Sequence, residues 1–196
     1  KGYSIIQEVA VGYNLDTTLS TTYANTNNAK PPDNNLTFHI YSKGTGPETL
    51  YFAELTQGVN RPEVIIPNTI TYKDNNNHDH AILVRSIYHA FANFDNLEKV
   101  TIPDNVEILR SKQNIRSGSF AYCSNLTSVT ITDTINNPSK LEFIGEWTFY
   151  RSAITSITIP ASVTSIGYPA FARCYGLTSV TINNPSKLEF IGDFAF

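Results

Sequence analysis

Apolar side chains recur along the second half of the chain in the order apolar-x-x-apolar-x-apolar, with polar residues between them. The last two apolar positions alternate with hydroxyl or charged residues and are all Val or Ile, which is typical of a short strand with one buried face. Because such a strand needs a neighbour to cover its apolar side, we expect successive copies to stack as parallel strands about 4.8 Å apart. The four copies are Leu97/Val100/Ile102, Leu126/Val129/Ile131, Ile154/Ile157/Ile159 and Leu177/Val180/Ile182.

A phenylalanine preceded by a small or hydroxyl residue marks the start of each unit. A second apolar pair stands ahead of each later phenylalanine, and the order of these features never changes. The twelve residues TINNPSKLEFIG occur twice, at 134–145 and 181–192, and the offset of 47 residues fits two units. The five phenylalanines, spaced by 29, 29, 22 and 25 residues, are Phe91, Phe120, Phe149, Phe171 and Phe196.

Repetition of one unit in a fixed order predicts a solenoid, in which each unit is stable only against its neighbours. The five phenylalanine rings are then expected to align in a single interior column. Gly145, Gly167 and Gly192 permit a tight turn before the phenylalanine segment. We expect that segment to form a single helical or 3₁₀ turn.

One complete unit carries a family resemblance. Residues 163–182, VTSIGYPAFARCYGLTSVTI, resemble the repeat of the BspA-like leucine-rich-repeat family, whose pattern is close to V-x-x-I-G-x-x-A-F-x-x-C-x-x-L-x-x-V-x-I-P. The resemblance covers residues 82–196, and 64–72 resembles the incomplete unit that opens such arrays. Insertions interrupt it at 111–116 and 136–140. It implies a leucine-rich-repeat solenoid of short parallel β-strands with helical or 3₁₀ turns.

The chain divides into two parts by pattern. Residues 1–62 contain no repeats but have strand-like runs at 3–11, 36–41 and 50–55, separated by a polar segment at 14–35. We interpret them as a β-rich N-terminal cap that covers the first unit, with a small independent module as the alternative. Residues 63–196 form the repeats, and the array ends mid-repeat at Phe196. Continuation of the array is favoured over closure of its open edge by a second copy.

Composition restricts the possible functions. Hydrophobic residues make up 41% of the 196 residues, charged residues only 16%, and the net charge is −3. Without a basic region no nucleic-acid partner is expected, and no apolar run approaches the roughly 18 residues that span a membrane. The surface is rich in Thr, Asn and Ser, and this uncharged polarity favours an extracellular protein.

The outward positions of the repeated strands are the candidate binding residues. They form two columns of mostly hydroxyl side chains, which could bind an extended protein or glycan through many weak contacts. The alternative is that Thr simply suits a solvent-facing strand. Exposed aromatic rings at Trp147, Tyr150, Tyr168 or Tyr175 would strengthen the binding interpretation. The eight strand-face candidates are Lys99, Thr101, Ser128, Thr130, Ser156, Thr158, Ser179 and Thr181.

No catalytic site is expected at the cysteines. Cys123 and Cys174 occupy equivalent positions two units apart, with Ser152 between them, and two steps of about 4.8 Å exceed the ~7 Å Cα limit for a disulfide. We therefore predict free, buried thiols. A Cys–His dyad is not expected, because all four histidines precede the unit that holds Cys123. These are His39, His78, His80 and His89.

Other chemistry is weakly indicated. His78-Asp79-His80 follows Asp74, but no third rigid ligand is evident and the Asn-rich stretch suits a hairpin loop, so no metal or cofactor is predicted. Glu142/Glu189 and Glu146/Asp193 recur two units apart, which sequence duplication explains better than a glycosidase pair. The usual phosphate, dinucleotide, hydrolase and zincin motifs are absent.

The resemblance implies a secreted or surface-attached protein of a host-associated microbe. We therefore expect a non-enzymatic extracellular or cell-surface interaction protein that adheres to host proteins or cells through the solenoid. The partner is expected to be a host or microbial surface protein, with a glycan as the second candidate. A carbohydrate-binding or surface-scaffold component is the alternative function. Function itself must be argued from a site, because a fold does not determine it.

Overall fold

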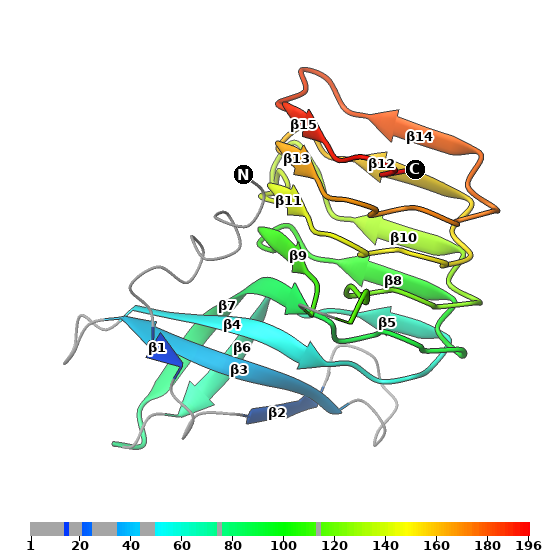
Figure 1. Ribbon diagram of the computed structural model, residues 1–196. Coiled ribbons are helices and arrows are strands. Elements are labelled where there is room, and N and C mark those ends of the chain that lie inside the picture. The colour runs from blue at the N-terminus through cyan, green and yellow to red at the C-terminus, as the bar shows by residue number, and fades with distance from the viewer. Residues whose placement is uncertain (1–13, 16–20, 25–34, 44–49, 74–75, 113–114) are drawn as a thin grey trace.

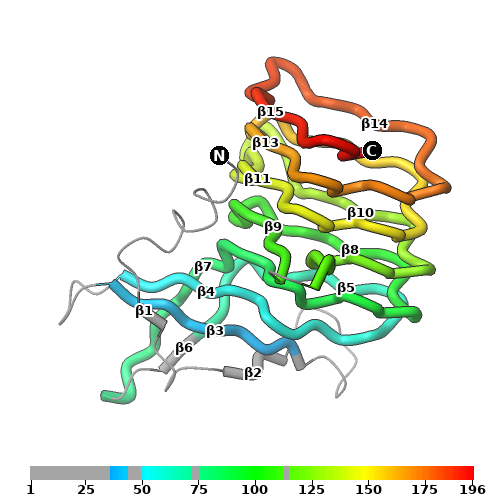
Figure 2. The backbone as a smooth tube through the Cα atoms, viewed as in Figure 1, coloured from blue at the N-terminus to red at the C-terminus, as the bar shows by residue number. Residues whose placement is uncertain are grey.

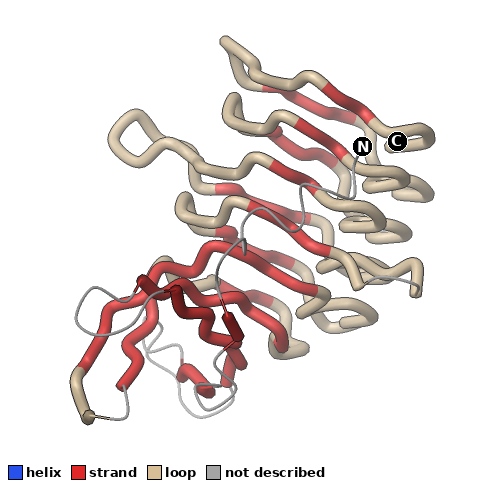
Figure 3. Tube along the Cα trace, turned by 60° about the vertical axis from the view of Figure 1, so that its left-hand side comes forward, coloured by secondary structure: helices blue, strands red, loops and turns tan. Residues whose placement is uncertain are grey.

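The structure is a computed structural model, and it describes residues 14–15, 21–24, 35–43, 50–73, 76–112 and 115–196. Every regular element within these ranges is a β-strand (Figure 3). The strands stack into a column of parallel rungs with an antiparallel region at its N-terminal end (Figure 1). Among the residues that the structure describes, no helix has the length and apolarity needed to cross a membrane.

Two parallel ladders form the repeats, and the path between them is plain in the tube view (Figure 2). In the first ladder Val100 lies opposite Val129 and Ile157 lies opposite Val180, so equivalent positions of the units are in register. The two halves of this ladder meet where the Thr155 N–H donates to the Thr127 carbonyl at 3.5 Å. Its strands are β5 (Glu63–Ile65), β8 (Lys99–Ile102), β10 (Ser128–Ile131), β12 (Ser156–Ile159) and β14 (Ser179–Ile182).

The second ladder is built from the apolar pair ahead of each phenylalanine. It runs parallel from β7 (Asp79–Tyr88) through β9 (Ile108–Arg110), β11 (Phe143–Ile144) and β13 (Ser165–Ile166) to β15 (Phe190–Ile191). The parallel stacking predicted from the sequence is confirmed in the first ladder, and the apolar pairs form a second parallel ladder that was not predicted.

The phenylalanine rings form one interior column. Successive rings stack nearly parallel, with centroid distances of 5.1 Å, 5.3 Å, 5.1 Å and 5.1 Å and interplanar angles of 13° or less. The first four rings are fully buried, whereas the last is 52% exposed because only one ring covers it in this sequence. The predicted column is confirmed: Phe91, Phe120, Phe149, Phe171 and Phe196.

The segment around each phenylalanine contains no helix, and the single turn expected there is present only as isolated turns with the i→i+3 bond of a 3₁₀ turn. It consists of separate i→i+3 turns, such as Ser152 N–H to the Phe149 carbonyl at 2.9 Å. Left-handed residues interrupt the backbone on both sides of Phe149, with φ 58° at Trp147 and 57° at Arg151. A positive φ cannot continue a right-handed turn, so no helix propagates.

The glycines before these turns are required for a steric reason. A Cβ at Gly145 would lie 2.3 Å from the Leu109 carbonyl oxygen, and one at Gly167 would lie 2.7 Å from the Glu146 nitrogen. Real Cβ atoms do not approach backbone so closely, so the backbones of neighbouring units meet here only because the side chain is missing.

The N-terminal region is antiparallel. Here β1 (Asn14–Leu15), β2 (Thr21–Ala24) and β4 (Leu50–Gln57) all pair with β3 (Asn35–Lys43). The strands predicted at 36–41 and 50–55 are confirmed, whereas the run at 3–11 lies outside the described residues. The polar segment at 14–35 contributes β1 and β2, two short strands that widen this sheet.

The repeats connect to this region without a break in the sheet. Strand β4 pairs in parallel with β7, which also forms an antiparallel hairpin with β6 (Thr69–Lys73). The opening unit expected at 64–72 is therefore only partly a rung: β5 joins the first ladder, but β6 turns back onto β7. Neither periodicity nor propensity specifies such a long-range pairing.

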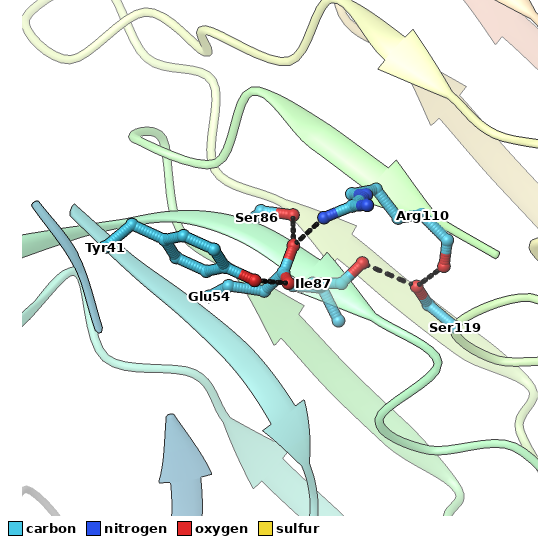
Figure 4. A network of polar contacts seen from close by, with 6 residues as sticks. All are labelled: Tyr41, Glu54, Ser86, Ile87, Arg110 and Ser119. Carbon is cyan, nitrogen blue, oxygen red and sulfur yellow. Dashed lines mark hydrogen bonds and ion pairs between the residues drawn. The ribbon is translucent and has the colours of Figure 1, made fainter. Parts of the chain in front are cut away.

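A buried polar network lies at this connection (Figure 4). The Glu54 carboxylate, 2% exposed, accepts from the Ser86 hydroxyl and the Arg110 guanidinium, both at 2.6 Å. The Tyr41 hydroxyl donates to the same carboxylate at 3.2 Å, and burial together with this negative charge raises the pKa of Tyr41 to about 12. Four side chains thus join strands β3 and β4 to the first rungs of the second ladder.

Candidate binding surfaces

The eight predicted strand-face residues lie side by side. Ser128 is opposite Lys99 and Thr130 is opposite Thr101. Seven of the eight are exposed and Thr101 is half-buried, while their neighbours Val100 and Ile102 point inward. The same pairing recurs farther along the ladder, for Ser156 with Ser179 and Thr158 with Thr181. We call these two columns the strand-face ladders.

A second surface runs along the outside of the phenylalanine turns. Trp147 packs edge-on against Tyr150 at 4.7 Å and against Tyr168 at 6.0 Å, and Tyr150 in turn contacts Tyr122 at 5.4 Å. Of the four aromatics named from the sequence, the structure brings Trp147, Tyr150 and Tyr168 together. Tyr175 projects separately and is 88% exposed.

Arginines lie over these rings. The Arg116 guanidinium stands 5.8 Å from the Trp147 ring centroid, and Arg151 stands 6.0 Å from the Tyr122 ring. Contacts of this kind hold a guanidinium against an aromatic face while leaving its N–H groups in water. We call Tyr122, Trp147, Tyr150, Tyr168 and the arginines above them the aromatic strip.

Arg151 and Arg173 form a pair of exposed cations that the sequence analysis did not predict. Both side chains are exposed and stand over the same Tyr150 ring, at 5.7 Å and 6.0 Å. They occupy the same position of successive units, two residues after Phe149 and Phe171, and a hydrogen bond from the Arg151 N–H to the Ala172 carbonyl joins the two turns at 3.1 Å. Aligning the units on phenylalanine would have revealed this pair.

The cysteines are free and buried, as predicted. The Cys123 thiol donates to the Phe91 carbonyl at 3.0 Å and the Cys174 thiol to the Phe149 carbonyl at 2.9 Å. Ser152 stands between them and contacts the Cys174 sulfur at 3.5 Å. Burial raises the pKa of Cys123 to about 12 and also raises that of Cys174, so both are held as thiols that bond to the backbone.

The remaining titratable candidates do not form a reactive cluster. Glu142 and Glu189 are separated by one intervening rung, at Thr164. Burial raises the pKa of the Glu146 carboxyl group. His89 is half-buried in its turn, where burial and then Lys112 lower its pKa.

The predicted hairpin around His78 is present, since β6 and β7 pair antiparallel, although Asp74 lies outside the described residues. Within the described ranges no three His, Cys, Asp or Glu side chains are grouped to hold a metal ion.

The parallel ladders and the ring column define a leucine-rich-repeat protein. A family model described as "BspA type Leucine rich repeat region" matches residues 86–196 in six copies, which is more than half of the chain. The chain belongs to this family. Leucine-rich-repeat proteins generally act as non-enzymatic binding scaffolds, and the matched family indicates no enzyme.

Solved structures share this fold. The T. pallidum leucine rich repeat protein TpLRR has a TM-score of 0.59 at 22% identity, covering 78% of this chain and 62% of that protein. The pneumococcal vaccine antigen PcpA has a TM-score of 0.62 at 18% identity, covering 88% of this chain and 40% of PcpA. A leucine-rich repeat protein from Bacteroides capillosus has a TM-score of 0.52 at 27% identity, covering 73% of this chain and 99% of that protein. This chain therefore spans less than two thirds of the first two proteins. Among curated protein sequences, none matches it.

Proposed function

We propose that this chain is a non-enzymatic interaction protein, secreted or held at the cell surface, that adheres to a host or microbial surface protein through its solenoid. The observation that carries this proposal is the alignment of the strand-face ladders. A flat parallel sheet that presents hydroxyl groups in register offers many weak, spaced contacts to an extended partner.

Localisation at the surface or outside the cell is part of the proposal. The low charge content and the surface rich in Ser and Thr support it, as does the fold shared with PcpA, which is described as a vaccine antigen. Residues 1–62 serve as the cap of the array in this proposal, because β4 pairs with β7 and so covers the edge of the first rung of the second ladder.

The test compares two double variants of the full chain in adhesion to epithelial cells and to immobilised extracellular-matrix protein. Thr130→Glu/Thr158→Glu places two carboxylates on the strand-face ladders. Thr69→Glu/Thr71→Glu makes the same change on β6, where both residues are also exposed strand threonines.

We expect the ladder variant to lose adhesion by at least about tenfold, because a partner bound on the strand face would bury the two new carboxylates without a countercharge. The β6 variant should retain its adhesion, because its carboxylates lie outside that face. Equal adhesion of the two variants, at matched thermal stability, would show that the strand face is not the binding surface. Absence of adhesion in the unsubstituted chain would refute the proposed function itself.

A carbohydrate-binding or scaffold role is the second candidate. The observation that favours it is the cluster of Trp147, Tyr150 and Tyr168, since aromatic faces stack on sugar rings. However, these rings contact one another edge-on, and arginines stand over several of them. Binding on a glycan array that disappears in Trp147→Ala, with protein adhesion unchanged, would favour this role.

A further inference from the structure

The turn that follows Phe149 is one residue shorter than its counterparts. In the units that begin at Phe91, Phe120 and Phe171, the next strand-leading Leu comes six residues later, whereas Ile154 comes five residues after Phe149. The missing position is occupied by Asn125 in the preceding unit and by Gly176 in the following one. The Asn125 side chain therefore has no counterpart in the next two units.

An open hollow of about 430 Å³ lies at this rung. Buried Ser152 and half-buried Ala153 form its floor, and the exposed side chains of Arg151, Arg173 and Tyr175 stand around it. We call this site the arginine hollow. Its shape follows from the shortened turn together with Gly176, because neither of these two units places a side chain where Asn125 stands in the preceding unit.

The two guanidiniums make the hollow positively charged. They stand within 6.0 Å of one ring centroid on directly adjacent turns, and neither has an ion pair or hydrogen bond to another described residue. Both positive charges belong to the lining of the same hollow, and the Tyr150 ring offsets only part of each charge. An anion bound in the hollow would be attracted by both charges and would accept hydrogen bonds from their exposed N–H groups.

We propose that the arginine hollow binds a carboxylate side chain of an acidic segment in a partner protein. This inference rests on the proposed function, since it supplies one charged contact to an interaction scaffold. Arg presents a planar fork of N–H donors that matches the two oxygens of a carboxylate. The exposed Tyr175 ring offers an apolar face beside the charged pair for the stem of a Glu side chain.

The openness of the hollow favours a polypeptide over a free small ligand. Sites for small molecules enclose most of the ligand surface, whereas this hollow is shallow and open to solvent. A Glu or Asp that protrudes from a larger partner needs no such enclosure, because the rest of the partner can rest on the neighbouring rungs.

The probe is a blocked decapeptide of alternating Glu and Gly that carries a fluorophore, and its Gln analogue is the reference. We expect the Glu peptide to bind at least about tenfold more tightly than the Gln peptide, and to weaken several-fold between about 0.05 M and 0.5 M NaCl as screening increases. Sialyllactose and inorganic phosphate serve as competing anions.

Two variants of the full chain change the hollow in different ways. Arg151→Gln/Arg173→Gln removes the charges and should weaken Glu-peptide binding by at least about tenfold. Gly176→Leu keeps both charges but fills space, since a Cβ at Gly176 meets its nearest neighbours at an ordinary 3.5 Å, and it should also weaken binding. Arg116→Gln removes an equally exposed arginine outside the hollow and is the matched control, with an expected change below about twofold.

The inference is overturned if the Glu peptide fails to bind, if the double Arg variant binds it as well as the control does, or if sialyllactose or phosphate binds more tightly than the peptide. If the chain adheres to cells but does not bind the Glu peptide, only the proposed role of the arginine hollow is refuted. If it binds the Glu peptide but does not adhere to cells, the proposed function is refuted and the carboxylate site remains.

Discussion

Replacement of Phe149 by Ala tests whether the ring column holds the array together. Phe149 is fully buried and stacks between Phe120 at 5.3 Å and Phe171 at 5.1 Å. Truncation of a buried Phe costs about 3–5 kcal/mol in total, and within that cost each aromatic pair accounts for about 0.5–1.5 kcal/mol. Because two pairs are lost at once, we expect a value in the upper part of this range, about 4–5 kcal/mol.

The matched comparison is Phe196→Ala. This ring is 52% exposed and stacks only on Phe171, at 5.1 Å. About half of the transfer free energy and one ring pair are lost, so we expect a cost of about 2 kcal/mol. Urea titration of both variants and of the unsubstituted chain, with the m-value fitted freely, measures the difference.

A gap of at least about 2 kcal/mol between the two variants supports nearest-neighbour coupling along the column. Losses that agree within about 0.5 kcal/mol would refute it, since a central and a terminal ring would then contribute equally. If Phe149→Ala fails to fold, Phe149→Leu retains most of the apolar volume but no stacking, and its expected cost is about 1–2 kcal/mol.

Three other changes have defined outcomes. Glu54→Leu leaves the partly buried Arg110 guanidinium without its 2.6 Å partner and should cost about 3 kcal/mol in urea titration, whereas Glu54→Leu/Arg110→Met should cost less than the sum of the single changes. Burial raises the pKa of Cys123 from 9.0 to about 12, so its stabilising contribution is complete below pH 9.0 and is lost as the pH rises toward about 12; Cys123→Ala should flatten the fall in melting temperature over that window. Gly167→Ala forces a Cβ to 2.7 Å from backbone and should cost about 1–3 kcal/mol, while Gly176→Ala, with 3.5 Å available, should cost less than about 1 kcal/mol; similar thermal shifts for the two would contradict the steric reason.

The spacing of apolar residues was sufficient to predict the register of the repeats. Once Val100 and Val129 occupy equivalent positions, burial of both requires that they lie opposite each other, because a shift by one residue would turn each to solvent. The same reasoning placed the phenylalanines in one column and kept the cysteines apart. These features depend only on contacts between successive units. The repeat spacing shows which residues of successive units are equivalent, and equivalent residues lie next to each other.

Other features depend on information that periodicity does not contain. The parallel pairing of β4 with β7 joins two segments that are not copies of one repeat unit, so the repeat pattern does not predict this pairing. The left-handed backbone at Trp147 and Arg151, which prevents a helix, occurs at residue types with no preference for positive φ. Packing between successive turns selects this conformation.

The candidate surfaces differ in the same way. The strand-face ladders were predictable, because outward positions follow from inward ones by the alternation of a strand. Arg151 and Arg173 do not stand out by residue type, but the turn that carries Arg151 is one residue shorter than its counterparts. A departure from the repeat length, rather than the repeat itself, located this site.

Stability and recognition occupy different side chains in this fold. The inward positions are fixed by stacking, so a change at Phe149 removes contacts with the rungs on both sides. Outward residues such as Thr158 and Arg173 are exposed to solvent. The outward positions are therefore free to carry groups that the fold does not need. Arg151 and Arg173 are such groups: both are exposed and both stand over the Tyr150 ring, outside the buried ring column. Two positive charges in the lining of one hollow, at positions where the scaffold could carry neutral residues, are most simply explained by a partner that brings the opposite charge.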